Sequence, residues 1–275
     1  MAATPSSNGP AGPGRRLRQR STIVESMGMP GLRREQQRAM LRVDVVTLFP
    51  ELFAPQIALS ILGRALERGL IDVRLHHLLD ALEGRERADD TPFGGGPGMV
   101  LRIEPLARVL DPLLALPSQR RALVLLTPAG RRFTQATAQR YSELEHVILV
   151  CGHYEGVDER LTQLYPVEEV SLGDFVLTGG EIPAMAVLDA TARLLPGAIT
   201  GDSLEHESFQ GGTLDHPVYT RPHTFRGLET PPVLLSGDHA AIAAWRREES
   251  RRRTAARRPD LGAAGENEKP TPPGD

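Results

Sequence analysis

Three residue types that enzymes use in catalysis occur close together in one short stretch of the chain. Residues 146–160, HVILVCGHYEGVDER, contain Cys151, His153 and Glu155, and Cys151 is the only cysteine of the sequence. A thiol, an imidazole and a carboxylate can serve as a nucleophile, its base and an orienting group. The same residues can instead form a loop that holds a ligand, and the two alternatives predict different enzymes.

The spacing favours a ligand-binding loop. Side chains that are neighbours at a strand end point in different directions, and catalytic partners are normally distant in sequence. Cys151 follows an apolar run, so we predict a buried, unreactive thiol. His153 has no second histidine at metal-ligand spacing, and we expect no metal site. Glu155 is suited to accept hydrogen bonds from a ligand; exposure to solvent is the alternative.

Three glycine-rich segments each follow a predicted strand: LTPAG (residues 126–130), VCGHYEG (150–156) and SLGDFVLTGGE (171–181). Ligands of parallel α/β sheets bind beyond the carboxyl ends of the strands, and glycine lets a backbone approach a ligand closely. The sequence lacks both GxGxxG and the P-loop pattern at these segments, which excludes those two nucleotide fingerprints. We therefore predict a small-molecule pocket formed by the three segments.

The elements that must position these segments alternate along the chain. Apolar, β-branched runs predict strands over residues 41–50, 71–78, 122–126, 147–150 and 167–172. Helical spacing predicts helices over residues 57–68, 104–116, 134–144 and 157–164, and another that begins at GGEIPA, residues 179–184. This order predicts an α/β domain with a mostly parallel sheet over residues 40–200.

The flanking regions have different compositions. Residues 1–39 are rich in Gly, Pro, Ser and Arg, which predicts a disordered extension or an upstream start codon with Met40 as the true beginning; a transit presequence is the alternative. Residues 201–232 lack periodicity and are predicted to be a flexible linker. Residues 233–261 are predicted to form a small helical domain, and residues 262–275 a disordered tail.

Bulk composition limits the classes of protein to which this chain can belong. The sequence has 275 residues, of which 40% are hydrophobic, and no apolar run approaches the ~20 residues of a membrane span. We expect no membrane partner, and a single cysteine fits a reducing cytoplasm. The net charge of -3 argues against a protein that binds nucleic acid through its charge as a whole.

Several long motifs occur in unbroken order over residues 40–260: VTLFPELF, TPFGGGPGM, ILVCGHYEGVDER, SLGDFVLTGGEIPAM, HPVYTRP and PPVLLSGDHAAIAAWR. This series resembles the bacterial tRNA (guanine-N1-)-methyltransferases, which methylate N1 of guanine 37, 3′ of the anticodon. The resemblance implies S-adenosylmethionine as cofactor, a SPOUT-type trefoil knot in the parallel-sheet domain, and a homodimer with active sites at the subunit interface. A Mg²⁺ requirement is a family expectation that no ligand spacing supports.

The resemblance also implies that the three glycine-rich segments are the walls of the cofactor site, with Glu155 holding the ribose or the amino-acid part of the cofactor. The implied cofactor-binding residues are Thr127, Pro128, Gly130, Gly152, Tyr154, Glu155, Leu172, Gly173, Asp174, Phe175, Val176, Leu177, Gly179, Gly180 and Pro183.

The reaction requires a base for the guanine N1 proton and a cation for charge that develops on O6. Arg193 matches the family's catalytic arginine; a cation that favours a helix C-terminus is its alternative role. Glu207 stands where the family has an aspartate and is our predicted base, with Asp215 as the alternative.

Contacts to tRNA are predicted on both sides of this segment, at Asp89, Asp90, Gly98, Ser208, Arg221, Arg246 and Arg247, with Arg251 to Arg253 as further phosphate contacts. A solvated helix face is the alternative for the C-terminal arginines. Two other functions compete: a SPOUT RNA methyltransferase with a different target nucleotide, and a non-catalytic RNA-binding module.

Overall fold

The structure is a computed structural model that describes residues 40–199 and 207–264. The predicted N-terminal extension, residues 200–206 and most of the predicted C-terminal tail lie outside the described residues. No helix in the described ranges combines the length and the apolarity that crossing a bilayer requires.

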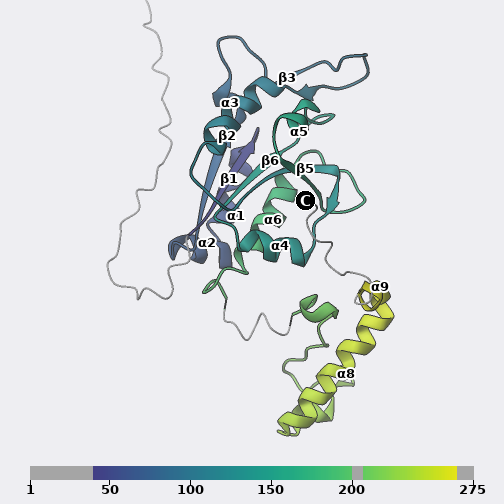
Figure 1. Ribbon diagram of the computed structural model, residues 1–275. Helices are drawn as coiled ribbons and strands as arrows, with labels where there is room; N and C mark the ends of the chain where they lie inside the picture. Colours follow the sequence, from purple (N-terminus) through teal and green to yellow (C-terminus); the bar gives the residue numbers. More distant parts are fainter. Residues whose placement is uncertain (1–39, 200–206, 265–275) are drawn as a thin grey trace, which may run out of the picture. The chain divides into compact units, whose positions relative to one another are not determined.

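A five-stranded sheet in the order β2-β1-β6-β5-β7 forms the centre of residues 40–199 (Figure 1). Every pairing in it is parallel, which confirms the predicted α/β class. Its strands are β1 (Leu41–Thr47), β2 (Ile71–His77), β5 (Arg121–Arg132), β6 (His146–Cys151) and β7 (Val167–Ser171).

Helices cover both faces of the sheet, because side chains alternate between the faces along each strand. On β6, Val147 and Leu149 belong to one apolar cluster, whereas Ile148 and Val150 belong to another. The first cluster includes residues of α2 (Ser60–Glu67), α4 (Gln135–Ser142) and α6 (Glu181–Ala192). The second includes residues of α3 (Ile103–Leu114) and α5 (Arg160–Leu164).

Short elements complete this region. The 3₁₀ turn η2 (Pro50–Leu52) and α1 (Ala54–Ile57) follow β1, and η3 (Leu78–Ala81) follows β2. The strands β3 (Asp89–Asp90) and β4 (Val100–Leu101) pair antiparallel at the base of the loop formed by residues 91–99.

Strand β5 is longer than predicted and its pairing with β7 is interrupted. Leu126 and Arg131 both lie opposite Val170, so residues 127–130 leave the ladder and return to it. An added Cβ on Gly130 would lie 2.3 Å from the Val170 nitrogen, and this close approach of two backbones requires glycine. The sequence predicted only residues 122–126 as strand, because Pro128 and Gly130 are typical of a loop.

A polar cluster lies inside the sheet around Asp44 of β1, which is fully buried. Its carboxylate accepts hydrogen bonds from Arg42 Nε, His76 Nε2 and His146 Nε2, each at 2.6 Å. Arg121 Nε donates to His146 Nδ1 at 3.2 Å, so Nε2 carries the proton of that imidazole. The cluster therefore joins β2, β1, β6 and β5 by charged and polar side chains.

The C-terminal part contains α8 (His239–Arg257), which lies within the helical domain predicted over residues 233–261, and α9 (Pro259–Ala264). The predicted linker contains the short elements η4 (Gln210–Gly212) and β8 (Thr224–Phe225) paired with β9 (Leu228–Glu229), and η5 (Pro232–Leu235) begins at its last residue. Leu214 is bonded to α8 at both backbone groups, through Thr254 Oγ1 and Ser250 Oγ. The predicted linker is thus attached to α8 at Leu214. Helix α9 extends into the predicted tail, which was expected to begin at residue 262.

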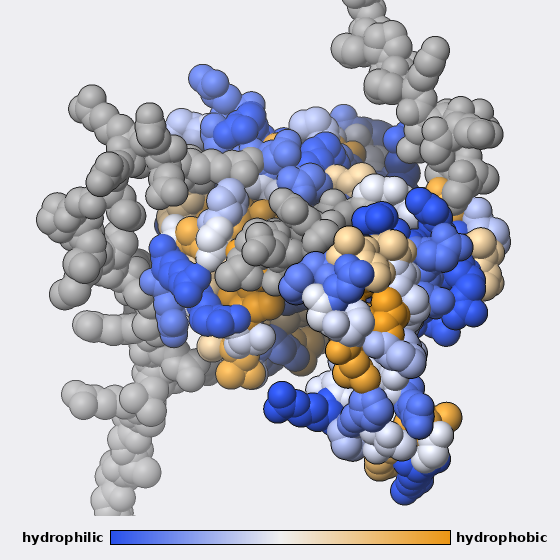
Figure 2. Space-filling model, turned by 90° about the horizontal axis from the view of Figure 1, so that it is seen from below, coloured by the Kyte–Doolittle hydropathy of each residue, from blue (hydrophilic) through white to orange (hydrophobic). Residues whose placement is uncertain are grey.

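Apolar side chains are also exposed. Phe93, Val176, Val218 and Leu228 are among the exposed large hydrophobic residues. Figure 2 shows hydrophobic residues interspersed with strongly hydrophilic ones on the face that it draws. Singly exposed apolar side chains are normal for proteins, and only a cluster of them beside a site indicates an interaction surface.

Candidate active site

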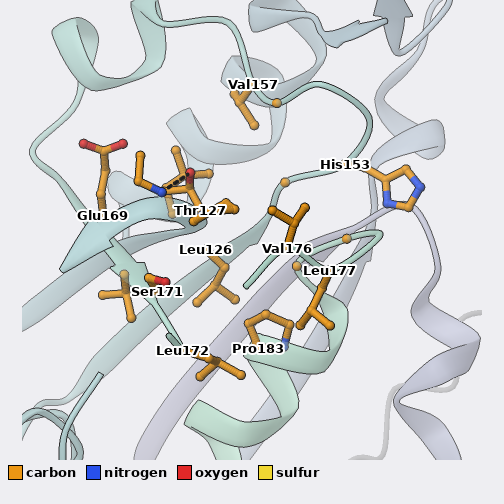
Figure 3. Close-up of a pocket in the computed structure, with 18 of the residues that line it drawn as sticks. Leu126, Thr127, His153, Val157, Glu169, Ser171, Leu172, Val176, Leu177 and Pro183 are labelled. Atoms are coloured by element: carbon orange, nitrogen blue, oxygen red, sulfur yellow. Dashed lines mark hydrogen bonds between the residues drawn. The ribbon is translucent and has the colours of Figure 1, made fainter. Parts of the chain in front are cut away.

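A cavity of about 380 Å³ opens at the carboxyl ends of β5, β6 and β7, a volume within the range of small-molecule sites. Figure 3 shows its lining drawn from the strand ends and the following loops. The structure brings most of the predicted cofactor-binding residues together around it: Thr127, Pro128, Gly152, Tyr154, Glu155, Leu172, Phe175, Val176, Leu177, Gly179, Gly180 and Pro183.

Three predicted cofactor-binding residues do not line the cavity. Gly130 packs against the backbone of β7, as described above. Asp174 Oδ2 accepts a hydrogen bond from Arg132 Nη2 at 2.8 Å in an exposed ion pair. An added Cβ on Gly173 would meet the ring of Phe175 at 2.9 Å. Their predicted role in cofactor binding stays a prediction.

Several lining residues are not among the individually predicted cofactor-binding residues. Some belong to the three glycine-rich segments that predicted the pocket: Leu126, Ala129, His153, Gly156, Ser171 and Thr178. The others lie outside those segments: Leu125, Val157, Glu159, Glu169 and Val170. Most are immediate neighbours of predicted residues, so adjacency was the available signal. Glu169 is different, because it reaches the cavity beside the interruption of the β5–β7 ladder. The sequence does not show that β5 pairs with β7 again after residues 127–130.

The loop between β3 and β4 packs against the cavity wall. Glu155 N donates to Met99 O at 2.9 Å, and Leu101 N donates to Gly156 O at 2.9 Å. Gly98 has a φ of +81°, and an added Cβ would lie 2.3 Å from Glu155 Oε1. Gly98, which is predicted to contact tRNA, therefore lies directly beside Glu155, which is predicted to contact the cofactor.

Cys151 is buried, as predicted. Burial raises the pKa of its thiol well above the ordinary value, and the nearby Glu181 carboxylate raises it further. A thiol that stays protonated is a poor nucleophile. Burial and a raised pKa therefore argue against Cys151 as the reacting group.

Arg193 and Glu207 form a bidentate ion pair. Arg193, the C-cap residue of α6, donates from Nη1 to Glu207 Oε2 at 2.6 Å and from Nη2 to Glu207 Oε1. The hydrogen bonds to Glu207 raise the pKa of the Arg193 guanidinium above its ordinary value. Two parallel bonds of this kind fix the orientation of both groups.

The alternative base is held differently. Asp215 N donates to Ser208 Oγ at 3.0 Å, and Asp215 Oδ1 accepts from His216 N at 2.7 Å. The structure thus groups Arg193 with Glu207 and Ser208 with Asp215. None of these four lies among the residues that line the described cavity.

The remaining residues predicted to contact tRNA are dispersed. Asp89 Oδ2 accepts from Arg87 Nη2 at 3.1 Å, and Asp90 Oδ1 accepts from Thr91 N at 2.8 Å. Arg221, Arg246 and Arg247 are exposed. On α8, Arg251 and Arg252 form ion pairs with Glu248 and Glu249, which reduces the net positive charge of that helix. Within residues 40–199 and 207–264, no cluster of His, Cys, Asp or Glu is placed to hold a metal ion.

A parallel α/β sheet with a cavity at its carboxyl ends defines a class of proteins that bind small organic ligands. Residues 41–264 match the family model described as tRNA (Guanine-1)-methyltransferase TrmD. The chain is 49% identical over 227 residues to a tRNA (guanine-N(1)-)-methyltransferase of Heliobacterium modesticaldum, covering 80% of this chain and 84% of the relative. It is 48% identical over 222 residues to that of Streptococcus uberis, covering 80% and 91%. The chain belongs to the TrmD family of tRNA (guanine-1)-methyltransferases.

Proposed function

We propose that this enzyme transfers a methyl group from S-adenosylmethionine to N1 of guanine 37 in tRNA, the nucleotide 3′ of the anticodon. The observation that carries the proposal is the family match over residues 41–264, which includes all three walls of the cavity. S-adenosylmethionine supplies the methyl group, bonded to a positively charged sulfur.

The cavity fits such a ligand. Leu126, Val176, Leu177 and Pro183 offer apolar surface for an adenine ring (Figure 3). The glycines of the walls leave backbone N–H and C=O groups open to a ligand. Glu155, Glu159 and Glu169 also line the cavity, and carboxylates complement the positive charges of a sulfonium and an amino group.

The same proposal includes a trefoil knot of the SPOUT type. The family match implies this knot. Contacts that hold the glycine-rich segments and β5 side by side are compatible with it. Phe133 N donates to Ser171 O at 2.7 Å, Gly180 N donates to Gly152 O at 2.8 Å, and β5 returns to pair with Val170 a second time. Sequence physics alone would not predict a knot.

In this proposal Glu207 removes the N1 proton of guanine and Arg193 stabilises the charge that develops on O6. Their ion pair supports the assignment, since it holds both side chains in one orientation. Glu207 is one methylene longer than the family's aspartate, so the backbone behind it must lie about one bond length farther from the substrate. Asp215 remains the alternative base. The residues proposed to contact tRNA are Asp89, Asp90, Gly98, Ser208, Arg221, Arg246 and Arg247.

We propose a homodimer, with each active site completed by the partner subunit. Two observations support it. Arg193 and Glu207 are not among the cavity-lining residues of this one chain. Next to the cavity, the side chains of Phe175, Val176 and Ile182 are 55%, 81% and 61% exposed, which suits an apolar subunit contact.

Two further expectations belong to the proposal. The family resemblance predicts a Mg²⁺ requirement, and an ion carried by the tRNA phosphates would be compatible with the described residues, among which no cluster of His, Cys, Asp or Glu is placed to hold a metal ion. Because the substrate is tRNA, we expect the enzyme to act in the cytoplasm.

The test uses the full chain, labelled S-adenosylmethionine and two tRNA transcripts that differ only at nucleotide 37. We expect label in the transcript with guanine 37 and none in the transcript with adenine 37. Equal label in both transcripts would instead identify an RNA methyltransferase with another target. Binding of tRNA without any transfer would identify a non-catalytic RNA-binding module.

A further inference from the structure

The carboxylate of Glu181 is buried directly behind the cavity wall. Glu181 is the first residue of α6, follows the lining residues Gly179 and Gly180, and is only 4% exposed. Burying a charge is costly unless hydrogen bonds or opposite charges compensate for it. The partners of this carboxylate therefore indicate what it does.

One partner is Thr47, the last residue of β1, which is 134 residues distant in sequence. The hydroxyl of Thr47 accepts a hydrogen bond from Phe49 N at 2.9 Å. Its single hydrogen is then free to be donated to Glu181 Oε1, at 2.8 Å. The bond ties the carboxyl end of the central strand β1 to the beginning of α6.

The second neighbour is His153, in the wall formed by residues 152–156. Its Nδ1 lies 3.9 Å from Glu181 Oε2 and is buried without a hydrogen-bond partner among the described residues. The ring packs against Phe49 and Tyr154, with centroid distances of 5.1 Å and 4.8 Å. Figure 3 shows the ring directed away from Thr127 and Leu126, on the outer side of its loop. A shortening of about 1 Å would complete a hydrogen bond to the carboxylate.

The two walls of the cavity meet at this point. His153 and Gly179 form an isolated antiparallel bridge, and Gly180 N donates to Gly152 O at 2.8 Å. An added Cβ on Gly179 would lie 2.3 Å from Glu181 Oε2 and 2.5 Å from His153 Nδ1. The backbone at Gly179, in the wall at residues 177–180, therefore lies close to both the Glu181 carboxylate and the imidazole of His153, which belongs to the other wall.

We propose that Glu181 is a positioning residue for S-adenosylmethionine: anchored by Thr47, it sets the spacing between the wall at residues 152–156 and the wall at residues 177–180 through His153. The inference rests on the proposed function, because it concerns the same ligand and the same cavity. Among the described residues, Cys151 and Tyr154 are further titratable groups beside the carboxylate or the imidazole, and burial raises the pKa of the Cys151 thiol. Glu181 thus places a carboxylate beside the imidazole.

The test compares Glu181→Gln, Thr47→Val and Thr47→Ser. We expect the first two to weaken binding of S-adenosylmethionine about tenfold or more, the loss expected for one hydrogen bond to a charged group. The dissociation constant is measured by calorimetry with the full chain. The KM for S-adenosylmethionine should rise by the same factor while the KM for tRNA stays unchanged. Thr47→Ser keeps the hydroxyl and should restore binding.

Thr191 provides a matched control on α6. It is 3% exposed, against 1% for Thr47, and its hydroxyl has no hydrogen-bond partner among the described residues. Thr191→Val should bind S-adenosylmethionine like the wild type, whereas an equal loss in this variant would show that general loosening of the helix causes the effect and would overturn the inference.

The outcomes separate this inference from the proposed function. If Glu181→Gln fails to fold, the contrast between Thr47→Val and Thr47→Ser decides the result. A wild-type chain that binds no S-adenosylmethionine overturns both proposals. A wild-type chain that binds and methylates, with folded Glu181→Gln and Thr47→Val binding equally well, overturns the positioning role alone.

Discussion

At the scale of single residues, the ion pair between Arg193 and Glu207 fixes the orientation of the proposed base. The guanidinium donates one bond to each carboxylate oxygen, and each oxygen keeps a further lone pair for a proton. O6 of guanine is a further acceptor for the Arg193 donors. In the proposed mechanism, a guanine bound in this way has its N1 beside the carboxylate of Glu207.

We expect Glu207→Gln to slow single-turnover methyl transfer roughly 10²- to 10⁴-fold, the usual contribution of a general base. The dissociation constant for S-adenosylmethionine should not change, because Glu207 does not line the cavity. Rapid-quench measurements with labelled S-adenosylmethionine check the rate, and calorimetry checks the binding.

Asp215→Asn is the matched control for this prediction, since it removes the alternative carboxylate. It should transfer methyl groups at a rate near that of the wild type. The reverse pattern, with a slow Asp215→Asn and a fast Glu207→Gln, would assign the base to Asp215. Glu207→Asp keeps the carboxylate but moves it about one bond length away from the substrate, so its rate is expected to lie between those of the wild type and Glu207→Gln.

The site residues were predictable to different degrees. The burial of Cys151 followed from the apolar run before it, and most lining residues followed from the glycine-rich segments. The contact between Thr47 and Glu181 could not be predicted, because it depends on how β1 and α6 meet in three dimensions. Non-local contacts of this kind leave no periodic signal in a sequence.

At the scale of elements, β5 shows where prediction from local pattern ends. The apolar run at residues 122–126 identified the strand, but its continuation to Arg132 depends on pairing with Val170. The hairpin of β8 and β9 was missed as well, since each strand has only two residues, too few to show an alternating pattern. Tertiary context decides both cases.

Gly130→Ala tests the importance of this crossing of strands. An added Cβ would overlap the backbone of Glu169 and Val170, which cannot rotate away as a side chain can. We expect the free energy of unfolding to fall by roughly 1–3 kcal/mol or more, measured by urea denaturation.

Gly173→Ala is the matched control, because its Cβ would meet only the ring of Phe175, which can rotate. Its free energy of unfolding should stay close to that of the wild type. Equal losses in both variants would mean that the backbone crossing is not the sensitive feature.

At the scale of the whole molecule, the cluster around Asp44 links stability to pH. Burial alone would raise the pKa of Asp44, but hydrogen bonds from His146, His76 and Arg42 hold it well below its ordinary value. A carboxyl group with a lowered pKa in the folded state stabilises the protein fully above its unfolded pKa, which is about 3.9 for aspartate. That contribution is lost as the pH falls below this value toward the pKa of the folded state.

We therefore expect Asp44→Asn to lower the free energy of unfolding by about 2 kcal/mol or more at neutral pH. The difference between wild type and variant should shrink as the pH falls below about 4, because Asp44 of the unfolded wild-type chain then becomes protonated while that of the folded protein stays ionised. Urea denaturation of both proteins over this pH range provides the measurement. A difference that stays constant with pH would contradict the assigned role of the charge.

The excursion of β5 at residues 127–130 is closed at both ends by pairing with the same residue, Val170. A wall held in this way loses its conformational freedom when the chain folds, so little is left to lose when a ligand arrives. The heat-capacity change of binding should then reflect buried apolar surface alone, without a contribution from coupled folding. Ordering this wall therefore costs conformational entropy when the protein folds and not when the ligand binds.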